Sequence, residues 1–169
     1  MTKRIVLAMA LVIGAAGSAN AQAISANASV AQVAQATGTQ RDLVFPDGTP
    51  GGAGGSAVTA AATAANAAGP QLGFVEYELN YSGPSVGVAA PATLSDGTNT
   101  IAVTFSCGEA DAAGTGLTLG ACGTHNLTFA GTGLQTRRVW VGGTISQAAI
   151  DGAAASSTYA GTVTLTLTP

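Results

Sequence analysis

The chain has 169 residues, which is enough for one domain of ordinary size, and 47% of them are hydrophobic while only 8% are charged. This balance excludes a disordered chain, and the negative net charge argues against nucleic acid as a partner. The 24 glycines and the many Thr and Val residues favour β structure over helix.

The first 21 residues have the organisation of a secretory signal peptide. Lys3 and Arg4 precede an apolar run, and Ala19 and Ala21 occupy the small-residue positions of a cleavage site. A membrane anchor is the weaker alternative, because the run is shorter than the ~20 residues that a spanning helix needs. We therefore predict residues 1–21 as a signal peptide, with Gln22 as the mature N-terminus. Loss of the two leader cations lowers the net charge from −3 to −5, and no transmembrane segment is expected in the mature chain.

The mature chain is expected to begin with a strand. Residues 22–36 are assigned to an N-terminal strand or donor extension, and residues 37–169 to one β-sandwich domain. The apolar residues of the first stretch alternate with polar ones, which is the period of a strand with one buried face: Ile24, Ala26, Ala28 and Val30. The period then slips, and Val30, Val33 and Ala34 would also suit a short helix.

Turn residues separate the segments that follow. A short strand is expected at residues 41–45, ended by PDGTPGGAGG. Residues 56–70 are Ala-rich and are interpreted as a weak strand and a loop. In residues 72–83, Val75, Tyr77, Leu79 and Tyr81 share one face, and Phe74, Glu76 and Glu78 share the other.

The second half of the chain continues the same pattern. Residues 92–108 predict two strands around an Asp96–Gly97 turn. Further strands are expected at residues 125–131, 135–146 and 156–169, with Val139 and Val141 on the face opposite Arg138 and Trp140. Short strands between Gly-rich turns, with few helical signals, predict an all-β fold: a single antiparallel β-sandwich, immunoglobulin-like or pilin-like.

The two cysteines, Cys107 and Cys122, both lie in the mature chain. An even count in an exported protein suggests a disulfide. It would close a loop of about 15 residues and stabilise the fold by roughly 3 kcal/mol. Two free thiols are the alternative. A zinc site would lack a fourth ligand, because His125 is the single histidine.

No residue pattern indicates catalysis. The single histidine has no Ser or Cys arrangement typical of a nucleophile beside it. Glu76 and Glu78 are better interpreted as a solvated strand face than as a glycosidase pair. Arg138 and Trp140 could touch a sugar, although cross-strand packing is the more ordinary use. We predict a non-enzymatic protein without a metal or cofactor.

The C-terminal third carries a recognisable pattern. A strand runs into VGGT, and after a loop a Tyr-x-Gly-Thr step leads into a terminal strand with Thr at every second position. The residues are Val141, Gly142, Gly143, Thr144, Tyr159, Gly161, Thr162 and Val163. This pattern resembles an uncharacterised family of secreted bacterial domains of pilin-like type. RDLVFPDGTPG at residues 41–51 is similar to the family's strand and Pro-Gly turn, with Pro46 and Asp47 where a Gly is expected. The broader likeness is to spore-coat-U-type and chaperone–usher pilin domains.

The resemblance implies a sandwich that lacks one strand. In such domains the terminal strand borders a groove that another subunit's N-terminal extension fills. Here the groove edge would be Val163, Leu165 and Leu167, and the donor face would be Ile24, Ala26, Ala28 and Val30. The implied partners are further copies of the chain in a homo-polymer, a periplasmic chaperone and an usher. The implied location is the fimbrium, cell surface or periplasm of a bacterium.

Two functions therefore stay open. The first is a structural or adhesin subunit of a cell-surface fibre. The second is a self-complete secreted sandwich that binds a small ligand or polysaccharide, in which residues 24–30 pair within their own chain. The Cys107–Cys122 spacing departs from the disulfide expected in the pilin families, which leaves both possibilities in place.

Overall fold

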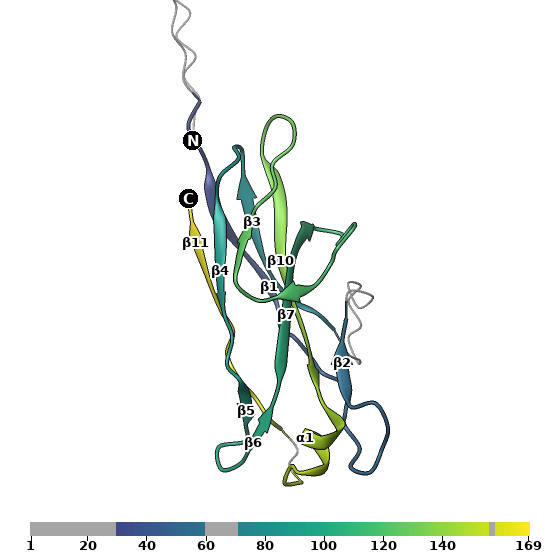
Figure 1. Cartoon of the computed structure of the whole chain (residues 1–169). Helices are drawn as coiled ribbons and strands as arrows, with labels where there is room; N and C mark the ends of the chain where they lie inside the picture. The colour runs from purple at the N-terminus through teal and green to yellow at the C-terminus, as the bar shows by residue number, and fades with distance from the viewer. Residues whose placement is uncertain (1–29, 60–70, 156–157) are drawn as a thin grey trace, which may run out of the picture. The chain divides into compact units, whose positions relative to one another are not determined.

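The computed structural model describes residues 30–59, 71–155 and 158–169 (Figure 1). In these ranges the chain forms strands β1 to β11 and one short helix, α1. The predicted signal peptide and its cleavage site lie outside the described residues, and so do Ile24, Ala26 and Ala28. The assignments made for them stay predictions.

The largest sheet has six strands. Its order is β1-β3-β10-β7-β8, and β2 pairs with one end of β10. The bounds are β1 Ala34–Arg41, β2 Ser56–Val58, β3 Gly73–Leu79, β7 Thr104–Asp111, β8 Gly120–Ala121 and β10 Gln135–Ile145. Every pairing in this sheet is antiparallel.

Two smaller antiparallel sheets complete the fold. The three-stranded sheet has the order β11-β4-β9, and the two-stranded sheet is the hairpin β5-β6. The bounds are β4 Ser85–Ala89, β5 Thr93–Ser95, β6 Thr100–Ala102, β9 Thr124–Asn126 and β11 Thr164–Thr168. The all-β prediction with antiparallel sheets is confirmed. The described strands divide into three sheets, and an immunoglobulin-like or pilin-like sandwich stays a prediction.

One hydrophobic cluster is shared by the six-stranded and three-stranded sheets, and we call it the inter-sheet cluster. Its buried members are Tyr77, Leu79, Val86, Leu127 and Val139, with Val75, Val88, Phe129, Leu165 and Leu167 packed against them. Tyr77 and Leu79 therefore share one buried face of β3, as the alternation predicts, because successive side chains of a strand point to opposite sides.

The opposite face of the six-stranded sheet is also covered. Phe74 and Trp140 belong to a second cluster, with their ring centroids 5.0 Å apart. Leu43 and Phe45 from the segment after β1, and residues of the loop between β7 and β8, pack on this cluster. Apolar side chains therefore cover both faces of this sheet, whereas many antiparallel sheets leave one face to water.

The structure corrects several local expectations. The strand expected at residues 125–131 is only β9, Thr124–Asn126, and the described part of the one expected at residues 156–169 is a strand only in β11, Thr164–Thr168. Val33 and Ala34 do not begin a helix: Ala34 opens β1, which pairs with β3. Residues 41–45 form no continuous strand, and only Val44 makes an isolated bridge, to Gln71. Helix α1, Gln147–Asp151, follows β10 and was not expected.

Helix α1 has a simple local cause. The Ser146 side chain accepts a hydrogen bond from the Ala149 amide, which is the bond of an N-cap. The helix buries Ile150 in a third cluster, together with Ile145 and with Ile101 of the β5-β6 hairpin. A five-residue helix has no stability of its own, so this contact holds it in place.

The β5-β6 hairpin confirms the predicted turn. Gly97 has φ 95°, a conformation that L residues avoid, and the Asp96 carboxylate accepts hydrogen bonds from the Thr98 and Asn99 amides.

The predicted disulfide is present and joins Cys107 of β7 to Cys122. Cys122 lies between β8, which pairs with β7, and β9, which pairs with β4. The bond therefore fixes the chain where it crosses from the six-stranded to the three-stranded sheet. Because such bonds persist where thiols are oxidised, it indicates an extracytoplasmic location.

Candidate functional site

Strand β11 forms one edge of the three-stranded sheet. It pairs with β4 from Thr164 opposite Ala89 to Thr168 opposite Ser85. Among the described residues, no strand pairs with its other side. Leu165 is half-buried and turned to the inter-sheet cluster, as is Leu167, while the three threonines of the strand are exposed. The alternation of this strand thus separates an apolar inner face from a hydroxyl-bearing outer face.

A groove with a volume of about 1280 Å³ lies beside β11. One wall is the C-terminal segment that leads into β11, including Val163 and Leu165. The other wall is the end of β1 with the segment after it, including Arg41 and Phe45. Phe74 and Val75 of β3 also line the groove, so side chains from both the six-stranded and the three-stranded sheet border it.

The end of the groove farther from the C-terminus is apolar. Phe45 and Phe105 meet edge to face there, with their ring centroids 6.5 Å apart. Ile145 and Ile150 of the third cluster also line it. A strand or an apolar ligand in this groove would remove these side chains from water, which is favourable by about 25 cal/mol per Å² of apolar surface.

The C-terminal wall is held by defined bonds. The backbones of Ser95 and Ala160 exchange two hydrogen bonds of 2.8 Å. The Tyr159 hydroxyl donates to the Ala154 carbonyl oxygen at 2.7 Å. Gly161 is needed here, because a Cβ at this position would lie 2.8 Å from Leu94 Cδ2. The Tyr-x-Gly-Thr step seen in the sequence is therefore a wall of the groove.

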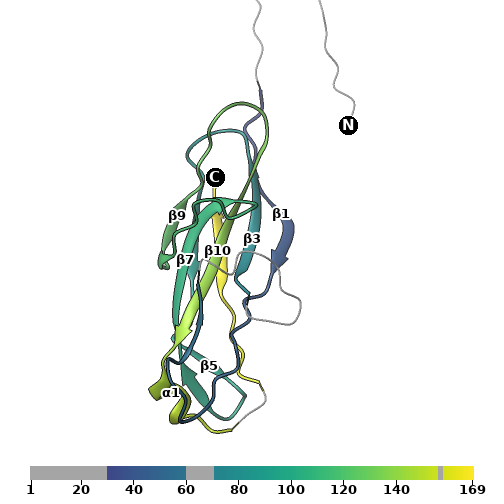
Figure 2. The same cartoon turned by 90° about the vertical axis from the view of Figure 1, so that its right-hand side faces the viewer.

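The facing edge of the groove belongs to β1, the outermost strand of the six-stranded sheet (Figure 2). Its pairing with β3 shifts register between Ala36 and Gln40, next to Gly38 with φ 82°. The Thr37 hydroxyl lies 3.1 Å from Glu76 Oε1 and donates to it. The groove is thus flanked by the edge strands of two sheets, one from each end of the described chain.

The structure places only part of the predicted donor segment. Residues 31–36 lie along β3 of their own chain. Val30 is 86% exposed, and the rest of the donor face is outside the described residues. Val163 and Leu165 line the groove, whereas Leu167 lies in the inter-sheet cluster beyond it. The donor and groove-edge assignments themselves stay predictions.

Two arginines, Arg41 and Arg138, lie over the Phe74 ring, and Arg41 also lines the groove. The guanidinium carbon of Arg138 lies 4.0 Å from the centroid of the Phe74 ring, and that of Arg41 lies 5.0 Å from it. Nε and Nη2 of Arg138 both donate to Glu76 Oε2, at 2.9 and 2.8 Å. Burial, and secondly the charge of Arg138, lower the pKa of the Arg41 guanidinium below its ordinary value.

The sequence predicted only part of this arrangement of arginines, aromatic rings and Glu76. The alternation places Arg138 and Trp140 on one face, and the structure shows their stacking at 5.6 Å. Glu76 is not simply solvated, because Arg138 lies directly opposite it on β10 and pairs with it. Arg41 was missed, since it comes from a distant edge strand and no local signal joins it to Phe74.

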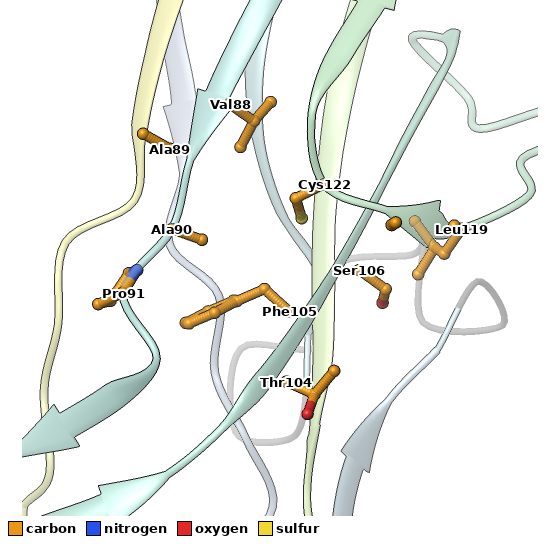
Figure 3. Close-up of a pocket in the computed structure, with 11 residues that line it drawn as sticks. Val88, Ala89, Ala90, Pro91, Thr104, Phe105, Ser106, Leu119 and Cys122 are labelled. Atoms are coloured by element: carbon orange, nitrogen blue, oxygen red, sulfur yellow. The ribbon is translucent and has the colours of Figure 1, made fainter.

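A second, shallower recess of about 640 Å³ lies beside the disulfide (Figure 3). It is lined by residues 88–91, 104–106 and 119–122. Figure 3 shows Phe105 and Pro91 among its lining side chains. None of the lining side chains carries an ionisable group apart from the disulfide-bonded Cys122, so the recess offers no acid–base chemistry.

Other candidate chemistry gains no support in the part of the chain that the structure describes. His125 lies on β9 opposite Val86, and its Nε2 atom has no hydrogen-bond partner there. Within residues 30–59, 71–155 and 158–169, no three His, Cys, Asp or Glu side chains gather as metal ligands would. The same ranges hold no helix with the length and hydropathy of a membrane span.

Comparisons of the chain with protein-family models, with curated proteins and with solved structures find no match. The pilin-like resemblance therefore rests on the sequence pattern alone. The observations together identify a mostly-β protein of antiparallel sheets with an internal disulfide. Its groove lies between two sheet edges, β1 and β11, that pair with no further strand within the described residues.

Proposed function

We propose that this chain is a non-enzymatic, exported structural protein, a pilin-like or adhesin subunit of a cell-surface fibre that assembles with further copies by β-strand addition. The observation that carries the proposal is the edge of β11 that no described strand pairs with, beside a groove with an apolar end. Strand addition needs both features, because the edge supplies main-chain hydrogen bonds and the groove receives alternate side chains.

The β11 edge lacks the devices that usually protect such strands. Its five residues, Thr164–Thr168, include no charge and no proline. Exposed edges of this kind pair readily with other chains, and proteins normally blunt them with Lys, Pro or a bulge. β1 shows such a device, the irregularity at Gly38, and β11 does not. An unprotected edge is consistent with a strand that has a partner.

The proposed partner strand is residues 22–30 of another copy. These nine residues span about 30 Å when extended, at ~3.3 Å per residue. Their apolar side chains, Ile24, Ala26, Ala28 and Val30, would enter the groove on every second position. Because three of the four are small, the main-chain ladder must supply much of the affinity.

The proposal includes where assembly takes place. Export follows from the predicted signal peptide, and the disulfide agrees with an oxidising compartment. In a bacterium, a periplasmic chaperone and an usher are the partners that would hold and deliver such a subunit. The finished subunit would lie on the cell surface or in a fimbrium.

The test uses a truncated protein, residues 31–169, and a synthetic peptide of residues 22–30. We expect the peptide to raise the melting temperature of the truncated protein and to form a 1:1 complex in native mass spectrometry. Leu165→Asp should abolish binding, because it puts an unpaired charge in the groove. Thr166→Asp is the matched control, since Thr166 is the exposed neighbour on the same strand and should leave binding intact.

Far-UV circular dichroism of both variants checks that each remains folded. A truncated protein that ignores the peptide, together with mature protein that stays monomeric at all concentrations, would refute strand addition.

A second candidate function is favoured by the aromatic lining of the groove. Phe45, Phe105 and Tyr159 all border it, and β1 already pairs within its own chain, as a self-complete domain requires. In this case the groove would bind a small ligand, or the surface a polysaccharide. Loss of stability on deletion of residues 22–30 from a protein that is monomeric throughout would favour this alternative.

A further inference from the structure

Asn80 holds the N-terminal segment with three hydrogen bonds. Its Oδ1 atom accepts from the Val33 amide at 2.8 Å, and its Nδ2 atom donates to the Ala31 carbonyl oxygen at 2.9 Å. Its backbone amide donates to the Val33 carbonyl oxygen at 3.1 Å. Asn80 follows the last residue of β3, and Leu79 is the partner of Ala34 in β1. The side chain therefore extends the β1–β3 pairing beyond the end of the strands.

The bonds of Asn80 determine where the N-terminal segment leaves the fold. The backbone of residues 31–33 is fixed along the line of β1, and Val30 beyond it is 86% exposed. This exit lies at the end of the fold where β11 finishes, because Thr168 pairs with Ser85, a few residues after Asn80. The groove lies farther back, beside Val163 and Leu165.

A segment that leaves here can fill its own groove only by reversing direction. It would have to turn within residues 28–33 and run back along the free edge of β1. The sequence there, ASVAQV, contains no Gly, Pro, Asn or Asp, and so none of the Asn-Gly, Asp-Gly or Gly-Gly pairs that favour a two-residue hairpin turn. Asn80 opposes the same turn, because its bonds hold Ala31 and Val33 in an extended conformation.

We propose that Asn80 is a positioning residue, a latch that directs residues 22–30 away from their own groove and toward the groove of a second copy. This inference rests on the proposed function and adds the reason why pairing occurs between chains. A tethered segment has an effective concentration in the millimolar range, so self-filling would win if the turn were easy. The latch and the absence of turn residues remove that advantage.

The first experiment tests the latch without any assembly. Hydrogen exchange of the Val33 amide is measured by NMR in the mature protein and in Asn80→Ala. We expect exchange to accelerate about tenfold, since one net hydrogen bond is worth about that factor. Asn126→Ala is the control, because Asn126 is an exposed asparagine on β9. Unchanged exchange of Val33 in Asn80→Ala would overturn the latch.

The second experiment supplies the missing turn. Asn80→Ala is combined with Val30→Asn and Ala31→Gly, which place an Asn-Gly turn at the exit. If the latch keeps the segment out of its own groove, the added peptide of residues 22–30 should bind monomeric mature protein and should bind the triple variant at least tenfold more weakly. Asn80→Ala with Val30→Ala and Ala31→Ser is the control, since it changes the same positions without a turn.

The outcomes separate the two proposals. If the truncated protein binds the peptide and the triple variant binds it as tightly as the mature protein, the latch inference is wrong and strand addition stands. If the truncated protein does not bind the peptide, strand addition is wrong and the latch has no role in assembly. If the truncated and mature proteins bind the peptide and only the triple variant binds it more weakly, the result supports both strand addition and the latch.

Discussion

Breaking the Cys107–Cys122 bond should lower the free energy of unfolding by roughly 3 kcal/mol. The two cysteines are 15 residues apart, and on the chain-entropy model closing a loop of that length costs the unfolded chain about this amount. Cys107 is only 1% exposed, so replacing it by Ala also removes a packed sulfur, worth about 1 kcal/mol. The double variant Cys107→Ala, Cys122→Ala should therefore lose roughly 3–4 kcal/mol.

The assay uses the single tryptophan of the chain. Trp140 is 1% exposed at the centre of the six-stranded sheet, so its fluorescence reports global unfolding in urea. Three samples are compared: oxidised protein, the same protein with a reductant, and the double variant. The reduced protein keeps both sulfurs and isolates the cross-link, whereas the variant adds the packing loss. For a domain of this size the thermal midpoint should fall by roughly 6–16 °C.

The reasoning fails if reduced and oxidised protein unfold at the same urea concentration. That result would mean that the crossover between the two sheets is held without the bond. A variant much less stable than the reduced protein would instead show that packing around Cys107, rather than the cross-link, is the larger contribution.

Three further predictions concern packing, an ion pair and pH. Gly142→Ala should lower the free energy of unfolding, measured in urea, by about 1–3 kcal/mol, because a Cβ there would lie 2.5 Å from a carbonyl oxygen of β2. Gly87→Ala is its control, with nothing nearer than 3.9 Å, and should be neutral or slightly stabilising. Arg138→Lys should lower the free energy of unfolding by about 1–2 kcal/mol, because an ammonium group cannot make both hydrogen bonds to Glu76 and also stack on the Phe74 ring. A loss smaller than the experimental error would contradict this prediction. Hydrogen bonds from the backbone and side chain of Thr115 lower the pKa of Asp111 below its ordinary 3.8. A carboxyl group whose pKa is depressed in the folded state stabilises the fold above pH 3.8. This stabilisation is lost as the pH falls through the folded-state pKa. Asp111→Asn should therefore flatten the decline of the urea midpoint below pH 4, and an unchanged slope would show that Asp111 is not responsible.

Several features were determined by the sequence alone, because each depends on neighbours along the chain. The alternation of Phe74, Glu76, Tyr77 and Leu79 placed them on the correct faces of β3, since side chains of a strand alternate whatever it pairs with. The Asp96–Gly97 turn follows from the one residue that tolerates its backbone angle. The disulfide followed from an even cysteine count in a chain with a predicted leader peptide.

Tertiary structure decided the features that depend on distant partners. Ala34 begins a strand although its local period is poor, because it pairs with Leu79 of β3 and because Asn80 bonds to the backbone of Val33 just before it. Arg41 reaches Phe74 only because β1 and β3 are neighbours. The resemblance predicted a groove beside the terminal strand, but the pattern of residues did not show that β1 and β3 supply its other walls. Alternation shows that a strand has two faces, but which of its backbone edges stays unpaired is set by the order of strands in the sheet, and segments far apart in the chain fix that order.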